Sequence, residues 1–289
     1  MEIIIRIKTP SRWEKDYLTP KIKKLIPESV ISYDIKKTTE ILISNYLKSG
    51  ELRNKDKLRY LIIPTSGTEN IPLKTVLKRG ITIIQNKNLI AKNVTNYLCD
   101  MIRKVTKSSL KSALRGKTIL LLGFGNIGKE IYHRFSKYNC KFNVIKKDPS
   151  KDKIKSRNIK VFGGLKDLKK ATYSSDIIIN VAPRIAGIND IFKKYGVEID
   201  DNALIINISR SGIINERKIL DGVVNGIYSG AILDVYSKDI KKKDYSHHPN
   251  IILTPHIAGI YLNGAEKIAK FIAKEIKKLR RSSFDNEFI

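Results

Sequence analysis

The chain has 289 residues, and its 56 lysines and arginines against 28 aspartates and glutamates give a formal net charge of +28. Hydrophobic residues make up 42% and charged residues 29%, which is typical of a folded globular protein and excludes global disorder. This length corresponds to about two domains. The charge points to an anionic partner, and the candidate classes are nucleic acid, a membrane surface and small acidic metabolites.

Several other classes are excluded by the residue pattern. No stretch approaches the roughly 18 consecutive apolar residues of a membrane-spanning helix. The N-terminal apolar run is interrupted by Glu2 and Arg6 and has no small-residue cleavage site, which argues against a signal peptide. Two cysteines, Cys99 and Cys140, and four histidines form neither a disulfide framework nor a set of metal ligands. We therefore expect a cytoplasmic protein with no metal site and no membrane partner.

The first ninety residues predict a small α/β unit with a parallel sheet. Short apolar runs at 2–7, 60–63 and 81–84 alternate there with helix-compatible segments such as 38–47. A longer helix is predicted over about 91–105, because one face carries Val94, Leu98, Met101 and Ile102. A basic, serine-bearing connector at 104–117 then leads to a different pattern.

From Thr118 onward the chain predicts repeated βαβ units. The expected strands are mostly continuous apolar runs, as in a sheet covered by helices on both faces, and lie at 118–123, 142–145, 176–181, 203–209, 231–235 and 251–254. Helical segments between them are expected at 129–138, 193–197 and 216–224. The segment 265–279 predicts an amphipathic helix, and we expect it to return to the N-terminal unit.

A glycine motif lies between the first of these strands and its helix. Residues 118–128 read TILLLGFGNIG, so that Gly123, Gly125 and Gly128 form the pattern G-x-G-x-x-G. The first glycine permits a tight turn, the second lets the backbone approach a pyrophosphate, and the third allows the helix to pack closely on the strand. The helix N-terminus adds free N–H groups and the positive end of its dipole. This context predicts a dinucleotide site rather than an ordinary glycine-rich turn.

The position that discriminates NAD from NADP has two interpretations. Asp148 stands about 20 positions after the motif, where an acidic residue binds the ribose hydroxyls of NAD. Lys146 and Lys147 directly precede it and suit the 2′-phosphate of NADP. If the strand ends at Ile145, Lys146 takes the discriminating place. Spacing favours NAD and local charge favours NADP, so the cofactor is NAD or NADP.

Four segments of the chain resemble the D-isomer-specific 2-hydroxyacid dehydrogenases, which include glycerate and phosphoglycerate dehydrogenases and glyoxylate/hydroxypyruvate reductases. These segments read LLLGFGNIG, ALIINISRSGIINE, GAILDVYSKD and NIILTPHIAG, and a fifth, SGTENI with KRGITI downstream, resembles the family's N-terminal signature. The resemblance implies a Rossmann-type doubly wound parallel sheet inserted into a flavodoxin-like substrate domain. The substrate domain would then comprise residues 1–92, the dinucleotide-binding domain residues 93–259, and a C-terminal helix within 260–289 would complete the substrate domain.

Three polar residues follow or close predicted strands, at the edge where open α/β sheets bind ligands: Arg210, Asp234 and His256. The resemblance implies that Arg210 clamps the carboxylate of a 2-oxo acid and polarises its carbonyl. It implies that His256 is the acid/base that exchanges a proton with the substrate oxygen. Asp239 stands where the family has a glutamate, and a carboxylate there would orient the imidazole and raise its pKa.

Further positions match the family at the cofactor and the substrate. The resemblance implies that the substrate carboxylate is bound by the turn at Ser66 and Gly67. It implies cofactor contacts from Asn126, Ile127, Ala182, Pro183, Ile208, Ser209, Asp234 and Ala258. The chain departs from the family at Arg184 and Ile185, which replace Leu-Thr, at Ile63, where arginine is frequent, and at Ile90, where asparagine is expected.

These observations lead to two functional hypotheses. The first is an NAD(P)-dependent oxidoreductase, a homodimer that interconverts a small 2-oxo acid and a D-2-hydroxy acid by hydride transfer. The second is a catalytically silent, corepressor-like protein that senses nucleotides and contacts nucleic acid or protein. The basic residues are spread along the chain, with no aromatic-interleaved stripe and no helix-turn-helix pattern. We therefore favour the enzyme and expect no nucleic-acid partner.

Overall fold

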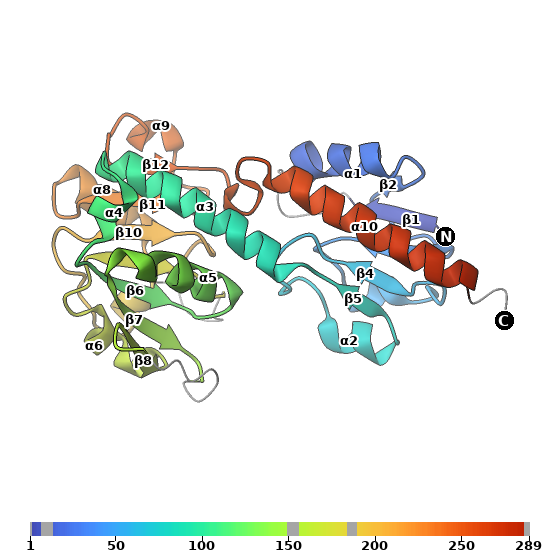
Figure 1. Ribbon diagram of the computed structural model, residues 1–289, viewed down its shortest axis with the longest axis horizontal. Coiled ribbons are helices and arrows are strands. Elements are labelled where there is room, and N and C mark those ends of the chain that lie inside the picture. The colour runs from blue at the N-terminus through green and yellow to red at the C-terminus, as the bar shows by residue number, and fades with distance from the viewer. Residues whose placement is uncertain (1, 7–13, 149–155, 184–189, 286–289) are drawn as a thin grey trace. The chain divides into compact units, whose positions relative to one another are not determined.

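The computed structural model describes residues 2–6, 14–148, 156–183 and 190–285, and the chain divides into two compact units. Unit 1 comprises Met1–Asn93 and Gly259–Ile289, and unit 2 comprises Val94–Ala258. The first division falls inside helix α3 (Lys87–Thr106), which contributes residues to both units. Each unit has its own sheet, coloured from blue to cyan in unit 1 and from green to orange in unit 2 (Figure 1).

Unit 1 contains a five-stranded parallel sheet in the order β2-β1-β3-β4-β5. Its strands are β1 (Glu2–Arg6), β2 (Val30–Ser32), β3 (Thr39–Ile43), β4 (Tyr60–Ile62) and β5 (Thr82–Ile84). The order 2-1-3-4-5 is that of the flavodoxin-like sheet, as expected for the substrate domain.

The segment 38–47 contains strand β3, so the helix-compatible interpretation of this segment was wrong. β3 lies between β1 and β4, and Ile41, Leu42 and Ile43 are all buried. A strand covered on both faces shows a continuous apolar run, which periodicity alone does not distinguish from a buried helical turn. The β-branched residues Thr39, Ile41 and Ile43 favour the extended backbone.

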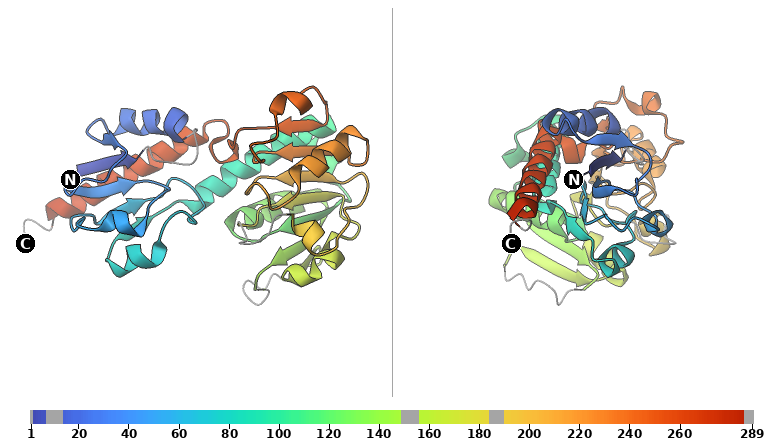
Figure 2. Two further views of the ribbon diagram at one scale, coloured as in Figure 1. Left: turned by 180° about the vertical axis from the view of Figure 1, so that it is seen from behind. Right: turned by 90° about the vertical axis from the view of Figure 1, so that its right-hand side faces the viewer.

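The helices of unit 1 include the long C-terminal helix expected at 265–279. They are η1 (Glu14–Leu18), α1 (Thr19–Leu25), η2 (Ser49–Leu52), α2 (Leu73–Lys78), the first part of α3, most of η5 (Ala258–Ile260), and α10 (Gly264–Asp285). The apolar stripe of α10 is buried at Ile268, Ile272 and Ile276. α10 runs alongside α1 (Figure 2), and Arg280 forms an ion pair with Glu28. The C-terminal segment therefore packs with the N-terminal part of the chain.

Unit 2 contains a seven-stranded parallel sheet in the order β12-β11-β10-β9-β6-β7-β8. Its strands are β6 (Thr118–Leu122), β7 (Lys141–Lys146), β8 (Ile159–Gly163), β9 (Ile177–Asn180), β10 (Leu204–Asn207), β11 (Gly230–Leu233) and β12 (Ile251–Leu253). When β6 is taken as the first strand, the order is the Rossmann order 3-2-1-4-5-6 extended by β12. The expected Rossmann-type fold is confirmed. β8 is the one strand here that periodicity missed, because it is a partly exposed edge strand with only Phe162 buried.

Helices cover both faces of this sheet. Those of unit 2 are the second part of α3, α4 (Leu110–Leu114), α5 (Asn126–Phe135), η3 (Ser136–Tyr138), η4 (Leu165–Asp167), α6 (Leu168–Thr172), α7 (Ile191–Lys194), α8 (Glu216–Val224) and α9 (Lys242–Tyr245). Alternate strand residues such as Leu120, Leu122 and Leu233 pack with α6, α7 and α8. α3 and α5 lie over the other face (Figure 1), where a Cβ added at Gly230 would come 2.7 Å from Val105 of α3.

Candidate active site

The candidate site lies at the carboxyl edge of the unit 2 sheet. All strand pairs in this sheet are parallel, so their carboxyl ends meet at one edge. The glycine turn follows β6, Arg210 follows β10, Asp234 follows β11, and His256 follows β12. Ligands bind at this edge in open α/β sheets.

The glycine turn has the geometry of a dinucleotide cradle. Gly123 has φ +102°, and a Cβ there would lie 2.9 Å from the backbone of Ala182. A Cβ at Gly128 would lie 2.6 Å from the carbonyl oxygen of Gly123. A Cβ at Gly125, by contrast, would meet nothing within 4 Å. The protein itself thus requires glycine at two of the positions, while the third leaves open space beside the backbone.

α5 starts directly after this turn, with Gly125 as its N-cap residue. The N–H groups of Asn126, Ile127 and Gly128 have no carbonyl partner within the helix, because the first turn of every α-helix lacks them. An open backbone, free N–H groups and the positive end of a helix dipole fit the pyrophosphate of a nicotinamide dinucleotide. When bound, this cofactor would supply hydride chemistry.

The residues that bear on NAD against NADP lie at the end of β7. This strand ends at Lys146, one residue later than Ile145, and Asp148 lies two residues beyond the strand. Lys146 and Asp148 are both half-buried and both have interaction partners, whereas Lys147 is exposed. The end of β7 therefore carries two candidates for contact with the cofactor's adenosine ribose, the cationic Lys146 and the anionic Asp148.

A buried polar network holds the loop that carries Arg210, and sequence reasoning missed it. Asn180 and Asn207 are fully buried at the ends of β9 and β10, and the Nδ2 of Asn180 donates to the Oδ1 of Asn207 over 3.0 Å. Asn207 donates in turn to the carbonyl of Arg210 over 3.1 Å and accepts from the N–H of Ser209 over 3.2 Å. Glu216 accepts from the N–H of Gly212 over 2.7 Å. The sequence does contain a signal for this network, because Asn180 and Asn207 are each the last residue of an apolar strand.

The same network brings several predicted cofactor residues together. The hydroxyl of Ser209 donates to the carbonyl of Ala182, and the N–H of Ile208 donates to the carbonyl of Asn180 over 3.3 Å. Ala182 is also the residue that crowds Gly123. Pro183 follows it and is exposed. The departures at positions 184 and 185 lie outside the described residues.

The guanidinium of Arg210 is hydrogen-bonded to the backbone of its own loop. Its Nη1 donates to the carbonyl of Ser209 over 2.8 Å. Burial lowers the pKa of the Arg210 guanidinium, which nevertheless stays charged near neutrality because an arginine's ordinary pKa lies far above neutral pH. A half-buried cation at this edge attracts a carboxylate.

Asp234 is the centre of the loop that carries His256. Its side chain is 1% exposed and accepts three hydrogen bonds, from the Thr254 hydroxyl at 2.6 Å, the Ile257 N–H at 2.8 Å and the Ala258 N–H at 2.9 Å. The N–H of His256 donates to the carbonyl of Asp234 over 2.8 Å. His256 has φ +59°, an uncommon backbone conformation for a residue other than glycine. Asp234 therefore fixes His256 in a conformation that its backbone does not favour by itself.

The two charged groups near His256 shift the pKa of its imidazole in opposite directions. Burial lowers the pKa of His256, the guanidinium of Arg210 lowers it further, and the carboxylate of Asp234 raises it. Burial raises the pKa of Asp234, while its hydrogen bonds and His256 oppose that shift. The lowered pKa favours the neutral imidazole in the unliganded protein, which is the form that accepts a proton.

The structure places Asp239 with Arg217 rather than with His256, in contrast to the expected pairing. The carboxylate of Asp239 lies 2.9 Å from the Nη2 of Arg217, and its side chain is 62% exposed. A hydrogen bond from Ser237 and the contact with Arg217 lower the pKa of Asp239. An aspartate is one methylene shorter than the family's glutamate, and here it meets a cation on the neighbouring helix α8. Asp234 is the carboxylate whose charge acts on His256.

The predicted carboxylate turn lies in unit 1, after β4. Ser66 and Gly67 are half-buried, and the hydroxyl of Thr65 donates to the carbonyl of Gly67 over 3.2 Å. The side-chain amide of Gln85, which follows β5, donates to the carbonyl of Thr65. The turn is therefore anchored to the segment after the neighbouring strand.

The part of the chain that the structure describes offers neither a metal site nor a membrane-spanning helix. No cluster of three or more His, Cys, Asp or Glu side chains there could hold a metal ion. No helix among these residues is both long and apolar enough to cross a membrane.

Comparison with known proteins identifies the family. A sequence model of the D-isomer specific 2-hydroxyacid dehydrogenase NAD binding domain matches residues 89–258. The chain is 27% identical to D-3-phosphoglycerate dehydrogenase of Archaeoglobus fulgidus over 238 residues, which is 74% of this chain and 44% of the relative, so it spans less than half of that protein. It is 24% identical to hydroxypyruvate reductase of Thermotoga maritima over 93% of this chain and 90% of the relative.

A solved structure shows the same fold over nearly the whole chain. D-lactate dehydrogenase from Aquifex aeolicus, crystallised with NAD and lactic acid, matches with a TM-score of 0.69 and 16% identity, covering 98% of this chain and 97% of that one. The family model covers more than half of this chain. The protein belongs to the D-isomer-specific 2-hydroxyacid dehydrogenase family and carries its NAD binding domain.

Proposed function

We propose that the protein is an NAD(P)-dependent oxidoreductase that interconverts a small 2-oxo acid and the corresponding D-2-hydroxy acid. The observation that carries the proposal is the arrangement of Arg210, Asp234 and His256 beside a glycine turn with dinucleotide geometry. Family membership favours this activity over the alternative of a catalytically silent binding protein.

Each polar group has a role in this reaction. Arg210 pairs with the substrate carboxylate and polarises the C2 carbonyl. In reduction, His256 donates a proton to the C2 oxygen as negative charge develops there. In oxidation, the neutral imidazole accepts the hydroxyl proton. Asp234 stabilises the imidazolium and holds its loop.

Substrate binding also adjusts the proton affinity of His256. In the free protein, burial and Arg210 lower the pKa of the imidazole. A bound 2-oxo acid brings a carboxylate that offsets the charge of Arg210, and a negative charge nearby raises the pKa of a histidine. The anionic substrate thus promotes the protonation that its own reduction requires.

The cofactor contacts in the proposal are those of the glycine turn, with Asn126 and Ile127 at the pyrophosphate and Ala182, Ser209 and Asp234 near the nicotinamide. Asp148 favours NAD and Lys146 favours NADP. Substituting each by alanine separates the two cofactors, because loss of Asp148 should reduce the use of NADH and loss of Lys146 the use of NADPH.

The proposal also covers the location and the oligomeric state of the protein. We propose a cytoplasmic homodimer, for which the resemblance to the family is the support. Light scattering on the purified protein tests the dimer, and a monomer at micromolar concentration contradicts it.

A steady-state assay tests the activity directly. Purified protein is mixed with NADH or NADPH and with glyoxylate, hydroxypyruvate, pyruvate or phosphohydroxypyruvate, and oxidation of the nicotinamide is followed by absorbance. His256→Gln should lower kcat by about 100-fold or more, the usual size of a general acid–base contribution. His247→Gln removes an exposed histidine and serves as the matched control. The proposal fails if no pair of cofactor and 2-oxo acid is turned over.

A further inference from the structure

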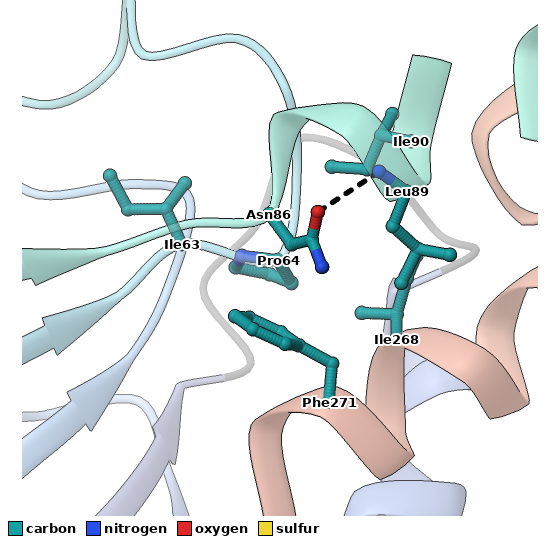
Figure 3. Close-up of a pocket in the computed structure, with 7 residues that line it drawn as sticks. All are labelled: Ile63, Pro64, Asn86, Leu89, Ile90, Ile268 and Phe271. Atoms are coloured by element: carbon teal, nitrogen blue, oxygen red, sulfur yellow. Dashed lines mark hydrogen bonds between the residues drawn. The ribbon is translucent and has the colours of Figure 1, made fainter. Parts of the chain in front are cut away.

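An apolar pocket in unit 1 and a buried carboxylate in unit 2 have no role in the proposed mechanism. Figure 3 shows the pocket between the end of β4, the start of α3 and helix α10. It has room for about one water molecule, so it cannot hold part of a substrate or cofactor. The carboxylate is that of Glu216, which lies in the first turn of α8 and is 4% exposed.

One oxygen of this carboxylate contacts the loop that carries Arg210. The Oε1 of Glu216 accepts from the N–H of Gly212 over 2.7 Å and from the Nδ2 of Asn207 over 3.5 Å. The carbonyl of Gly212 accepts from the N–H of Asp190 over 3.0 Å. The segment that follows Arg210 is therefore held on one side by the side chain of Glu216 and on the other by the backbone of Asp190.

Asn207 extends this connection to Arg210 itself and to the next strand of the sheet. Its Nδ2 donates to the carbonyl of Arg210 over 3.1 Å and to the carbonyl of Val235, the residue after Asp234, over 3.3 Å. Asn207 is fully buried, which shields these bonds from competing water. Glu216 and Asn207 together therefore hold the backbone of Arg210 and link it to the segment that carries Asp234.

The burial of Glu216 is costly for the folded protein. Burial raises the pKa of its carboxyl, the bond from Gly212 opposes this shift, and the negative charges of Asp239 and Asp190 add to it. A glutamate is seldom buried so fully, because its charged form loses hydration. Groups with a pKa shifted in this way are concentrated at functional sites. The start of a helix does not by itself require such a residue.

We propose that Glu216 is a positioning residue of the reaction, which fixes the backbone around Arg210 and thereby sets the affinity and orientation of the bound 2-oxo acid. This inference rests on the proposed function. A guanidinium pairs with a carboxylate through two parallel bonds, so a shift of about 1 Å in Arg210 weakens the pairing. The role is one of position rather than charge, because one oxygen makes both bonds and a neutral amide oxygen can accept them too.

Two substitutions of Glu216 separate position from charge, with glyoxylate and pyruvate as substrates. Glu216→Gln keeps an acceptor oxygen and removes the charge, so kcat/KM should stay within about threefold of the wild-type value. Glu216→Asp keeps the charge but withdraws the oxygen by one methylene, roughly 1.5 Å. It should lower kcat/KM by about tenfold or more, as expected when a group that positions the substrate is displaced. A wild-type value in Glu216→Asp, or an equal loss in both variants, overturns the inference.

Cofactor affinity and stability distinguish positioning from a general structural role. The glycine turn follows β6, two strands away from β10 in the sheet, so fluorescence titration should give the same NADH affinity for Glu216→Asp and the wild-type enzyme. Asp221→Ala is the matched control, because Asp221 lies on the same helix and accepts from the hydroxyl of Tyr245 over 2.8 Å. This control should lower the thermal midpoint and leave kcat/KM unchanged. An equal loss of NADH affinity and kcat/KM in Glu216→Asp, or an equal loss of kcat/KM in Asp221→Ala, overturns the inference.

A double substitution tests whether Glu216 acts through Arg210. In Arg210→Lys the two parallel bonds to the carboxylate are already lost, so adding Glu216→Asp should lower kcat/KM by less than about threefold. Losses that multiply in the double variant overturn the inference and leave the proposed function standing. A wild-type enzyme that turns over no 2-oxo acid contradicts the proposed function instead.

Hydrogen exchange tests the contact in the wild-type protein and applies if Glu216→Asp does not fold. The amide of Gly212 lies in a half-buried loop, and its bond to Glu216 should slow exchange by at least about 100-fold relative to an unstructured peptide. Exchange of this amide at the rate of an unstructured peptide overturns the inference, whether or not a 2-oxo acid is turned over.

Discussion

The hydroxyl oxygens of Tyr97 and Thr254 lie 2.6 Å apart, although 157 positions separate these residues in the chain. The Thr254 hydroxyl donates its single hydrogen to Asp234, so Tyr97 must be the donor in its bond with Thr254. A chain of hydrogen bonds therefore runs from α3 through Thr254 to the carboxylate that acts on His256. Tyr97 is fully buried, which shields this chain from competing water.

Tyr97→Phe should destabilise the protein with little effect on chemistry. The substitution keeps the ring but leaves the Thr254 oxygen without its donor, which costs about 1 kcal/mol in the free energy of unfolding. Urea denaturation measures this change, and Tyr173→Phe, at a 76% exposed tyrosine, is the control. Equal stability of the two variants would show that the Tyr97 bond contributes nothing.

Asp234→Asn should move the pH dependence of reduction to lower pH. The carboxylate of Asp234 raises the pKa of His256, so its removal lets burial and Arg210 lower that pKa further. In the proposed mechanism, reduction requires the protonated imidazole and is lost as pH rises through this pKa, so the loss should begin at lower pH in the variant. The pH profile of kcat/KM measures the shift. Asp244→Asn, at an exposed aspartate, should leave the profile unchanged, and an upward shift in Asp234→Asn contradicts the assigned role.

Asp239→Asn should leave both activity and pH profile close to those of the wild-type enzyme. The structure pairs this exposed carboxylate with Arg217, and an exposed ion pair contributes little to stability. Arg217→Gln breaks the same pair from the other side and should behave alike. A large loss of kcat in Asp239→Asn alone would return Asp239 to the mechanism as the partner of His256.

Gly125→Ala should impair cofactor binding without impairing the fold. A Cβ there meets no protein atom within 4 Å, so the thermal midpoint should change little, while the methyl group enters the space proposed for the pyrophosphate. NADH fluorescence titration measures the affinity, with Gly50→Ala as a control at another uncrowded glycine. Gly128→Ala should lower the thermal midpoint as well, because its Cβ would lie 2.6 Å from the Gly123 carbonyl oxygen. Unchanged NADH affinity in Gly125→Ala argues against the proposed cradle.

Local patterns in the sequence were enough to predict the Rossmann-type unit and the edge of its sheet at which ligands bind. Continuous apolar runs, the glycine pattern between a strand and a helix, and polar residues directly after strands are all set by neighbours in the chain. The placement of Arg210, Asp234 and His256 at one edge follows from parallel strands alone. Short or exposed strands such as β2 and β8 carry too little apolar pattern to be recognised in this way.

The tertiary structure decided which side chains meet. The sequence contains Asn180, Asn207, Tyr97 and Thr254 but does not indicate that they pair, because hydrogen bonds between distant segments depend on register and helix packing. It likewise predicts a carboxylate partner for His256, and only the fold shows that Asp234 acts on it while Asp239 turns to Arg217. Periodicity is a property of consecutive residues, whereas the environment of a buried charge is set by whichever segments the fold brings around it.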